Sequence, residues 1–248
     1  MAMVNRLTKK VTADGEELPV GALPATRLVM EQRVDRVDPD GTIHYGGTFA
    51  EATAMSTPGV SPSVLRAAQE NLDDQQGLTF TGEADVRGGV RNVKMDTSRV
   101  TNEMMRSMLD SMTSQIDNLA APFPSAAVGP GARWTAKSSA TTIGMEMQTT
   151  THYTLRSRDG DNYELDVTQE GDAPPGPIEI PGMPSSAKAS VERSEFTSKG
   201  TISGSLTFPL PGRLSMNGSS TAEITVTEEG ESGRLRQEMT TDFTLEPA

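Results

Sequence analysis

The stretch Val100–Leu119, VTNEMMRSMLDSMTSQIDNL, decides the fold that we predict for this chain. Its apolar residues recur at the three- and four-residue spacing of a helix and would form one broad stripe along it. They are Met104, Met105, Met108, Leu109, Met112, Ile116 and Leu119. Thr101 or Asn102 can cap the first turn, and Pro122 ends the pattern. We therefore predict a long amphipathic helix over residues 101–120.

Stretches that alternate between apolar and polar residues occupy most of the chain after Thr26. The strongest is residues 143–155, where the apolar residues all hold odd positions: Ile143, Met145, Met147, Tyr153 and Leu155. One strand of that length spans roughly 40 Å at about 3.3 Å per residue, so it must coil or bend. Turn sequences separate other strands, and they include Asp38–Gly41, Arg158–Asn162 and Lys199-Gly200.

These patterns together predict a mainly β fold of the α+β class. We expect a strongly curved antiparallel half-barrel sheet of about ten strands, packed on the long helix and on a short helix over residues 61–75. Ser61-Pro62 marks the start of the short helix, because proline is favoured at the first helical position. Residues 1–24 are polar and predict a flexible lead-in. Residues 25–248 would form a single domain with the helices inserted.

The overall composition excludes several classes of function. Thirty-four acidic residues outweigh 22 basic ones, which gives a net charge of −12 and argues against binding to nucleic acid. The chain has no cysteine, so it has neither disulfides nor thiol nucleophiles. No apolar run reaches the roughly 18 residues of a membrane helix. Because the polar start, Val4 to Val20, resembles that of a mature exported protein, we expect that a leader has been removed.

The sequence offers little sign of catalysis. Its two histidines, His44 and His152, both lie in strand-like alternation, and no G-x-S-x-G nucleophile motif occurs. The acidic turns Asp38–Gly41 and Asp159–Asn162 lack the spacing of a calcium-binding loop. We therefore predict a protein that is not an enzyme and that has neither a cofactor nor a metal site.

Methionine is the most unusual feature of the composition, with 14 residues in 248. Methionine side chains fill irregular cores, but they also adapt to varied apolar ligands. Their thioethers can ligate copper(I). Three interpretations therefore remain open: an ordinary core, the lining of a lipid cavity, or a copper(I) site.

Several short motifs resemble an uncharacterised family of bacterial exported proteins, many of them lipoproteins. These motifs are Val128-Gly129-Pro130-Gly131-Ala132-Arg133-Trp134, the strand around Tyr153 and Leu155, and the hairpin Arg158–Asp161. The architecture is similar to that of the LolA/LppX-like lipoprotein carriers. That resemblance implies a hydrophobic cavity between the helix and the sheet, but it implies no catalytic residue. The lipobox cysteine of a lipoprotein is absent from the chain.

We therefore predict a non-enzymatic binding protein of the bacterial cell envelope, periplasmic or on the outer surface. Its partner would be a lipid or another hydrophobic small molecule, and a second envelope protein is a further candidate. The expected cavity lining is Met104, Met105, Met108, Met112, Ile116, Ile143, Met145, Met147, Tyr153, Leu206 and Phe208. The alternatives are a structural or interaction module without a cavity, which would bind through strand edges, and the copper(I) protein.

Overall fold

The computed structural model describes residues 1–98, 121–142, 145–178, 183–184, 186–208, 210–228 and 231–248. Thirteen strands and one helix occur in these residues. The strands are β1 (Ala2–Ala13), β2 (Glu16–Leu18), β3 (Ala25–Val37), β4 (Ile43–Met55), β5 (Thr79–Ala84), β6 (Val90–Met95), β7 (Arg133–Thr142), β8 (Met145–Asp159), β9 (Asn162–Ala173), β10 (Gly176–Ile178), β11 (Lys188–Ser205), β12 (Arg213–Glu228) and β13 (Glu231–Glu246). The helix is α1, Pro62–Asp73.

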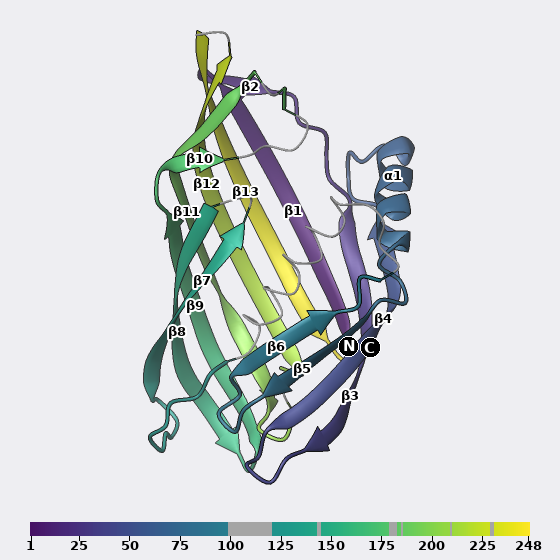
Figure 1. The fold of residues 1–248 in the computed structure, drawn as a ribbon, viewed down its shortest axis with the longest axis vertical. Coiled ribbons are helices and arrows are strands. Elements are labelled where there is room, and N and C mark those ends of the chain that lie inside the picture. The colour runs from purple at the N-terminus through teal and green to yellow at the C-terminus, as the bar shows by residue number, and fades with distance from the viewer. Residues whose placement is uncertain (99–120, 143–144, 179–182, 185, 209, 229–230) are drawn as a thin grey trace.

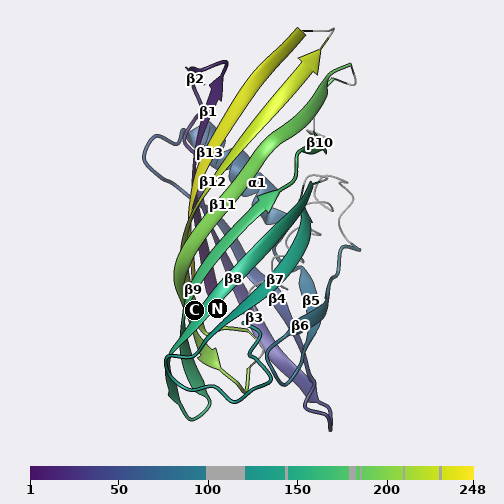
Figure 2. The ribbon, with the colours of Figure 1, turned by 90° about the vertical axis from the view of Figure 1, so that its left-hand side faces the viewer.

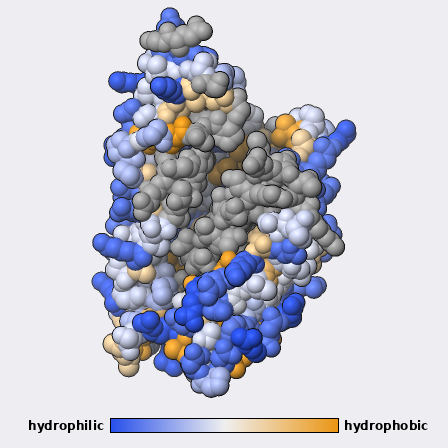
Figure 3. Space-filling view, in the orientation of Figure 1, coloured by the Kyte–Doolittle hydropathy of each residue, from blue (hydrophilic) through white to orange (hydrophobic). Residues whose placement is uncertain are grey.

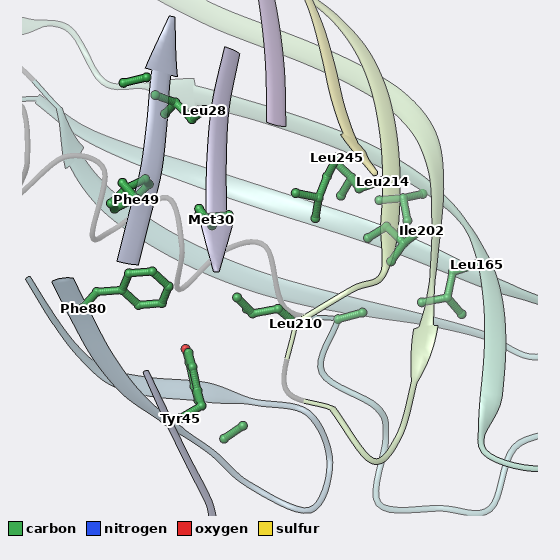
Figure 4. Close-up of a cluster of buried hydrophobic side chains, with 14 of the residues drawn as sticks. Leu28, Met30, Tyr45, Phe49, Phe80, Leu165, Ile202, Leu210, Leu214 and Leu245 are labelled. Carbon is green, nitrogen blue, oxygen red and sulfur yellow. The ribbon is translucent and has the colours of Figure 1, made fainter. Parts of the chain in front are cut away.

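All thirteen strands belong to one antiparallel sheet. Its order is β6-β5-β4-β3-β1-β13-β12-β11-β9-β8-β7, with β2 paired to β1 and β10 paired to β11. The described strands β6 and β7 stand at the two ends of this order, so the sheet is open. The long strands follow one another across one wall (Figure 2), and β5 and β6 run across their direction (Figure 1). Side chains of β3–β5 thereby face those of β9 and β11–β13, and the core lies between them (Figure 4).

The expected flexible lead-in over residues 1–24 is wrong, because half of it, strand β1, lies in the middle of the sheet. All twelve residues of β1 pair with β13, from Ala2 opposite Glu246 to Ala13 opposite Leu235. The other edge of β1 pairs with β3. The two chain ends therefore lie side by side (Figure 1). The polar composition of this stretch is misleading, because only one face of the strand is turned toward the interior.

The prediction of a mainly antiparallel β fold is confirmed, but the strand count of about ten is wrong. The short helix predicted over residues 61–75 is present as α1, and the Ser61 side chain accepts a hydrogen bond from Val64 N at 3.3 Å. The long helix predicted over residues 101–120 lies outside the described residues. Within the described part of the chain, no helix has the length and apolarity needed to cross a bilayer.

The sheet register aligns inward-facing side chains in rows that run across the strands. The row deepest in the core joins direct cross-strand partners from seven strands, and we call it the apolar row. It consists of Leu155, Leu165, Ile202, Leu214, Leu245, Met3 and Leu28. All except Met3 are less than 9% exposed, and Met3 packs against them. Burial of such side chains stabilises a fold by roughly 1.5–3 kcal/mol each, so this row contributes strongly to the stability of the sheet.

Glycines opposite large side chains relieve crowding on the inner face. The ring of Tyr163 lies over Gly204, and that of Phe196 lies over Gly171. The turn predicted at Lys199-Gly200 is wrong, because both residues lie within β11. A Cβ on Gly200 would fall 1.8 Å from the Ser215 carbonyl oxygen and 2.8 Å from Met216 Sδ. Gly200 therefore serves close strand packing instead of a turn.

Helix α1 covers the part of β4 that β5 leaves unpaired. The pairing of β5 with β4 stops at Thr48, although β4 continues to Met55. Gln69 of α1 substitutes for the missing strand. Its Oε1 accepts a hydrogen bond from Ala54 N at 2.8 Å, and its Nε2 donates to Ala52 O at 3.0 Å. One side chain thus satisfies two backbone groups at a sheet edge.

Candidate functional site

Further along β8, β9 and β11 from the apolar row, the inner face of the sheet becomes polar. Thr151, Gln169 and Ser198 are direct cross-strand partners on β8, β9 and β11. Gln169 Nε2 donates to Thr151 Oγ1 at 3.4 Å, and Ser198 Oγ donates to Gln169 Oε1 at 3.0 Å. We call these three residues the polar network. Because it presents hydroxyl and amide groups without a formal charge, it can orient a ligand by hydrogen bonds.

A pocket of about 320 Å³ lies against this network. One side is the inner wall of β7, β8, β9 and β11, and the other is the β5–β6 turn with Pro122. The described lining residues are Gly89, Val90, Pro122, Ala136, Lys137, Ser138, Thr149, Thr151, Tyr153, Gln169 and Phe196. The lining combines two aromatic rings, small apolar groups, neutral hydrogen-bonding groups and one lysine. This mixture is typical of sites for small organic ligands, which are mostly apolar with a few placed polar groups.

The connector that precedes β7 joins the two ends of the open sheet beside this pocket. Phe123 N donates to Arg87 O in the β5–β6 turn at 2.8 Å. Trp134 Nε1 on β7 donates to Pro122 O at 2.9 Å. The Phe123 ring lies 5.5 Å from Trp134 and 5.0 Å from Tyr163, between centroids. These contacts hold the β5–β6 turn at a fixed distance from β7 and so define the width of the pocket.

Tyr153 links the pocket to this aromatic cluster. Its ring stacks on Trp134 with centroids 5.4 Å apart. Burial raises the pKa of Tyr153 to about 12, although a hydrogen bond with Thr151 acts in the opposite direction. Burial also raises the pKa of Tyr163 to about 12, with a smaller contribution from Tyr153. Both phenols therefore remain protonated at neutral pH and act as hydrogen-bonding groups on an apolar surface.

The structure brings only part of the predicted cavity lining to this pocket. Tyr153 lines it, and Met147 is half-buried on the same face of β8. Met145 lies in β8, but its side chain is not among those described. The remaining predicted residues of the helix and of the strand start lie outside the described residues. They are Met104, Met105, Met108, Met112, Ile116 and Ile143.

Leu206 and Phe208 follow the end of β11, so the strand predicted for them is wrong, while their role in lining a cavity stays a prediction. Strand β11 ends at Ser205, and the chain turns at the two residues that follow. Leu206 is 39% exposed, whereas Phe208 packs against the edge of the core. Both line a separate hollow of only about 20 Å³ near Phe123. The strand pattern fails here because apolar residues at alternate positions can also occur in a turn that covers the end of a core.

Sequence reasoning missed Gln169 and Phe196 as lining residues. Each holds an inward position in its strand, between residues that alternate regularly with exposed ones. That alternation was a usable signal for the face on which each residue lies. The alternation did not indicate that β9 and β11 are neighbours, because the proline-rich segment that precedes β11 separates them in the sequence.

Both histidines take part in polar contacts on the outer face of the sheet. His44 Nε2 lies 2.7 Å from Asp38 Oδ2 and 3.0 Å from an Arg36 guanidinium nitrogen. The hydrogen bond with His44 is the main cause of the lowered pKa of Asp38, followed by the one with Arg36. His152 lies 3.1 Å from Thr135 Oγ1 and is exposed. Among the described residues, no three His, Asp or Glu side chains are grouped so that they could hold a metal ion.

Comparison with known proteins places most of this wall in one sequence family. Comparisons with curated proteins and with solved structures gave no match. The resemblance to the LolA/LppX-like carriers therefore stays a prediction. A family of unknown function, DUF6263, matches residues 92–230, which is more than half of the chain and includes β7, β8, β9, β11 and β12. The chain belongs to this family.

Proposed function

We propose that this protein is a non-enzymatic binding protein that holds a lipid or another small hydrophobic molecule against the inner face of its curved sheet. The observation that carries the proposal is the pocket of about 320 Å³ beside the polar network. Ligand pockets in proteins usually measure roughly 300–1,000 Å³, so this volume lies at the small end of that range.

The lining favours a ligand with an apolar body and a polar group. Tyr153, Phe196 and Val90 supply apolar surface, and each ligand methylene buried there would contribute about 0.8 kcal/mol. Gln169 and Thr151 supply neutral hydrogen-bonding groups at the same place. A purely apolar ligand would leave these groups without contacts to it, whereas an alcohol, an ester or an acid would use them.

The wider arrangement that we propose is a half-barrel whose open side is covered by the methionine-rich helix of residues 101–120. That helix would form the second wall of the cavity. We also propose a location in the bacterial cell envelope, which rests on the resemblance to exported proteins. The surface that Figure 3 displays is mainly hydrophilic, with hydrophobic residues in small separate groups. On the coloured part of that face, a hydrophobic ligand would find few apolar contacts.

Tryptophan fluorescence offers a direct test, because Trp134 is the only tryptophan and stacks on a pocket residue. Titration with decanol should change the Trp134 emission in a saturable manner. The Thr149→Leu variant should bind decanol at least about tenfold more weakly, since the larger side chain fills part of the pocket.

The matched control is Thr168→Leu, which changes an exposed threonine on the outer face of β9. It should leave decanol binding unchanged. If decanol produces no saturable signal, and native mass spectrometry finds no bound decanol at the same concentrations, the proposed function is wrong.

A second candidate is an interaction module that binds a partner through a strand edge. It is favoured by β7, a ten-residue strand with no partner on its outer edge among the described strands. Lys137 on this strand would discourage non-specific pairing. The copper(I) alternative depends on the methionines of residues 104–112, which lie outside the described residues. No observation on the described residues favours it.

A further inference from the structure

A lysine faces the inside of the sheet. Lys9 lies opposite Met239 in an unbroken register between β1 and β13. The same row continues through Ser220 and Phe196 to Gly171 and Thr149. Lys9 is half-buried, whereas its neighbours Thr8 and Lys10 are exposed. Lys10 points outward, where its Nζ forms an ion pair with Glu17 at 2.8 Å.

This lysine is the one charged residue in a large uncharged surface. It stands out among the inward positions of six strands, β1, β8, β9, β11, β12 and β13, between the apolar row and the row of Val191, Ile224 and Leu235. Lys9 alone carries a charge among them. Three acids lie on the inward side of β2, β12 and β13. Glu16 lies opposite Ala13, four residues along β1 from Lys9, or roughly 13 Å at about 3.3 Å per residue. Glu228 and Glu231 lie at the tip of the β12–β13 hairpin, and Glu231 is eight residues along β13 from Met239. That separation is roughly 26 Å at about 3.3 Å per residue.

Lys9 has no partner within the described part of the chain. No ion pair or hydrogen bond joins its Nζ to any of those residues. Its neighbours on β13 are Met239, the amide side chain of Gln237 and the hydroxyl of Thr241. Gln237 itself donates to Met239 Sδ at 3.1 Å. Lys9 is thus a half-buried lysine whose neighbours on β13 are all uncharged.

We propose that Lys9 binds the anionic head group of the ligand, which is an amphiphile with a carboxylate or phosphate group on an apolar tail. This inference rests on the proposed function and specifies the chemical class of its ligand. The tail would lie in the pocket that Phe196 and Tyr153 line. The head group would reach Lys9 along the row in which Ser220 and Met239 lie between Phe196 and Lys9.

The dimensions suit such a ligand. Phe196 on β11 and Lys9 on β1 are three strand spacings apart in one row. Three spacings amount to about 14 Å across the sheet. An extended chain of about ten carbons can connect the two positions.

The charge of the molecule makes an inward lysine selective. With a net charge of −12, the outer surface disfavours anions. One cation on an otherwise uncharged wall therefore distinguishes an anionic amphiphile from a neutral one of the same length, because charge-assisted hydrogen bonds are stronger than neutral ones. Lys137 is the only charged residue in the described pocket lining, but it is exposed on an edge strand, where solvent screens its charge.

Three probes of equal length test the proposal: decanoate, decyl phosphate and decanol, each titrated against Trp134 fluorescence. The wild type should bind at least one anion about tenfold more tightly than decanol. Lys9→Met should remove that preference by weakening anion binding about tenfold, with decanol binding changed less than twofold. Lys9→Arg should retain the preference. The matched control Lys10→Met and the variant Lys137→Met should both keep it.

The outcomes separate this inference from the proposed function. If all three probes bind and Lys9→Met retains the anion preference, or if Lys137→Met abolishes it instead, the role of Lys9 is disproved while the binding function stands. If none of the probes binds, the proposed function fails first. The stronger of the two anions identifies the source of the head group, a fatty acid or a phosphate-bearing lipid.

Discussion

At the scale of single residues, the inner face is built from side chains matched to the backbone opposite them. Gly171 and Gly204 leave room for the rings of Phe196 and Tyr163, which lie flat across the neighbouring strand. The rings thereby cover the sheet without forcing the strands apart. The phenol of Tyr153 is buried beside Trp134, and burial disfavours its ionised form.

The two phenols predict a loss of stability at alkaline pH. Their folded-state pKa of about 12 exceeds the ordinary value of 10, so below pH 10 both the folded and unfolded states hold the proton. Between pH 10 and 12 the unfolded state releases it first, and the free energy of unfolding falls. At pH 11 the loss should be roughly 1 kcal/mol for each tyrosine.

Urea unfolding at pH 9 and pH 11 checks this prediction. The wild type should lose more stability between the two values than a Tyr153→Phe, Tyr163→Phe double variant, by roughly 2 kcal/mol. Comparing each protein with itself removes the packing effect of the substitutions. Equal losses for both proteins would show that the two phenols are not the groups that titrate.

At the scale of secondary-structure elements, short local signals correctly predict one helix and the two turns at Asp38–Gly41 and Arg158–Asn162. The turn at Asp38–Gly41 joins β3 to β4, and Gly41 has the positive φ of +85° that such a turn requires. Ser61 caps α1 as expected. The contact that attaches this helix to the sheet has no such signal, because Gln69 resembles any exposed helical glutamine until β4 is placed beside it.

The attachment of α1 predicts a specific cost for the Gln69→Met variant. Methionine keeps the shape of the side chain but leaves Ala54 N and Ala52 O without their partners. The free energy of unfolding should fall by about 1–3 kcal/mol, measured by urea denaturation. Gln76→Met, at an exposed position just after the helix, is the matched control and should stay within about 0.5 kcal/mol of the wild type. A similar effect for both variants would contradict the edge-capping role.

At the scale of the whole molecule, the first strand joins the two halves of the sheet. β1 pairs with β13 on one side and with β3 on the other. The N-terminal amine adds a hydrogen bond to Met30 O at 2.6 Å. Without β1, the strand order would divide into the β3–β6 group and the β7–β13 group. The apolar row would then be interrupted at Met3, and the row that holds Lys9 would lose its last residue.

Deletion of residues 1–13 should therefore unfold the protein or reduce its midpoint of thermal unfolding by more than 10 °C, measured by circular dichroism. A ΔΔG of 1 kcal/mol already shifts the midpoint by about 2–4 °C for a chain of this size, and removal of a central strand costs several times more. A synthetic peptide of residues 1–13 added to the truncated protein should restore part of the stability. A truncated protein that unfolds at the wild-type temperature would show that β1 is dispensable.

The sequence by itself determined the local features of this protein: a mainly β chain, the start of α1, two hairpin turns, and the inward position of Tyr153 and Leu155. Alternation and turn chemistry depend on neighbours within a few residues, so they can be read without the fold. Only the tertiary structure decided the central place of β1, the polar network of Thr151, Gln169 and Ser198, and the inward charge of Lys9. Each of these depends on the register between strands that are distant in sequence. Cross-strand neighbours arise only when the whole sheet is assembled.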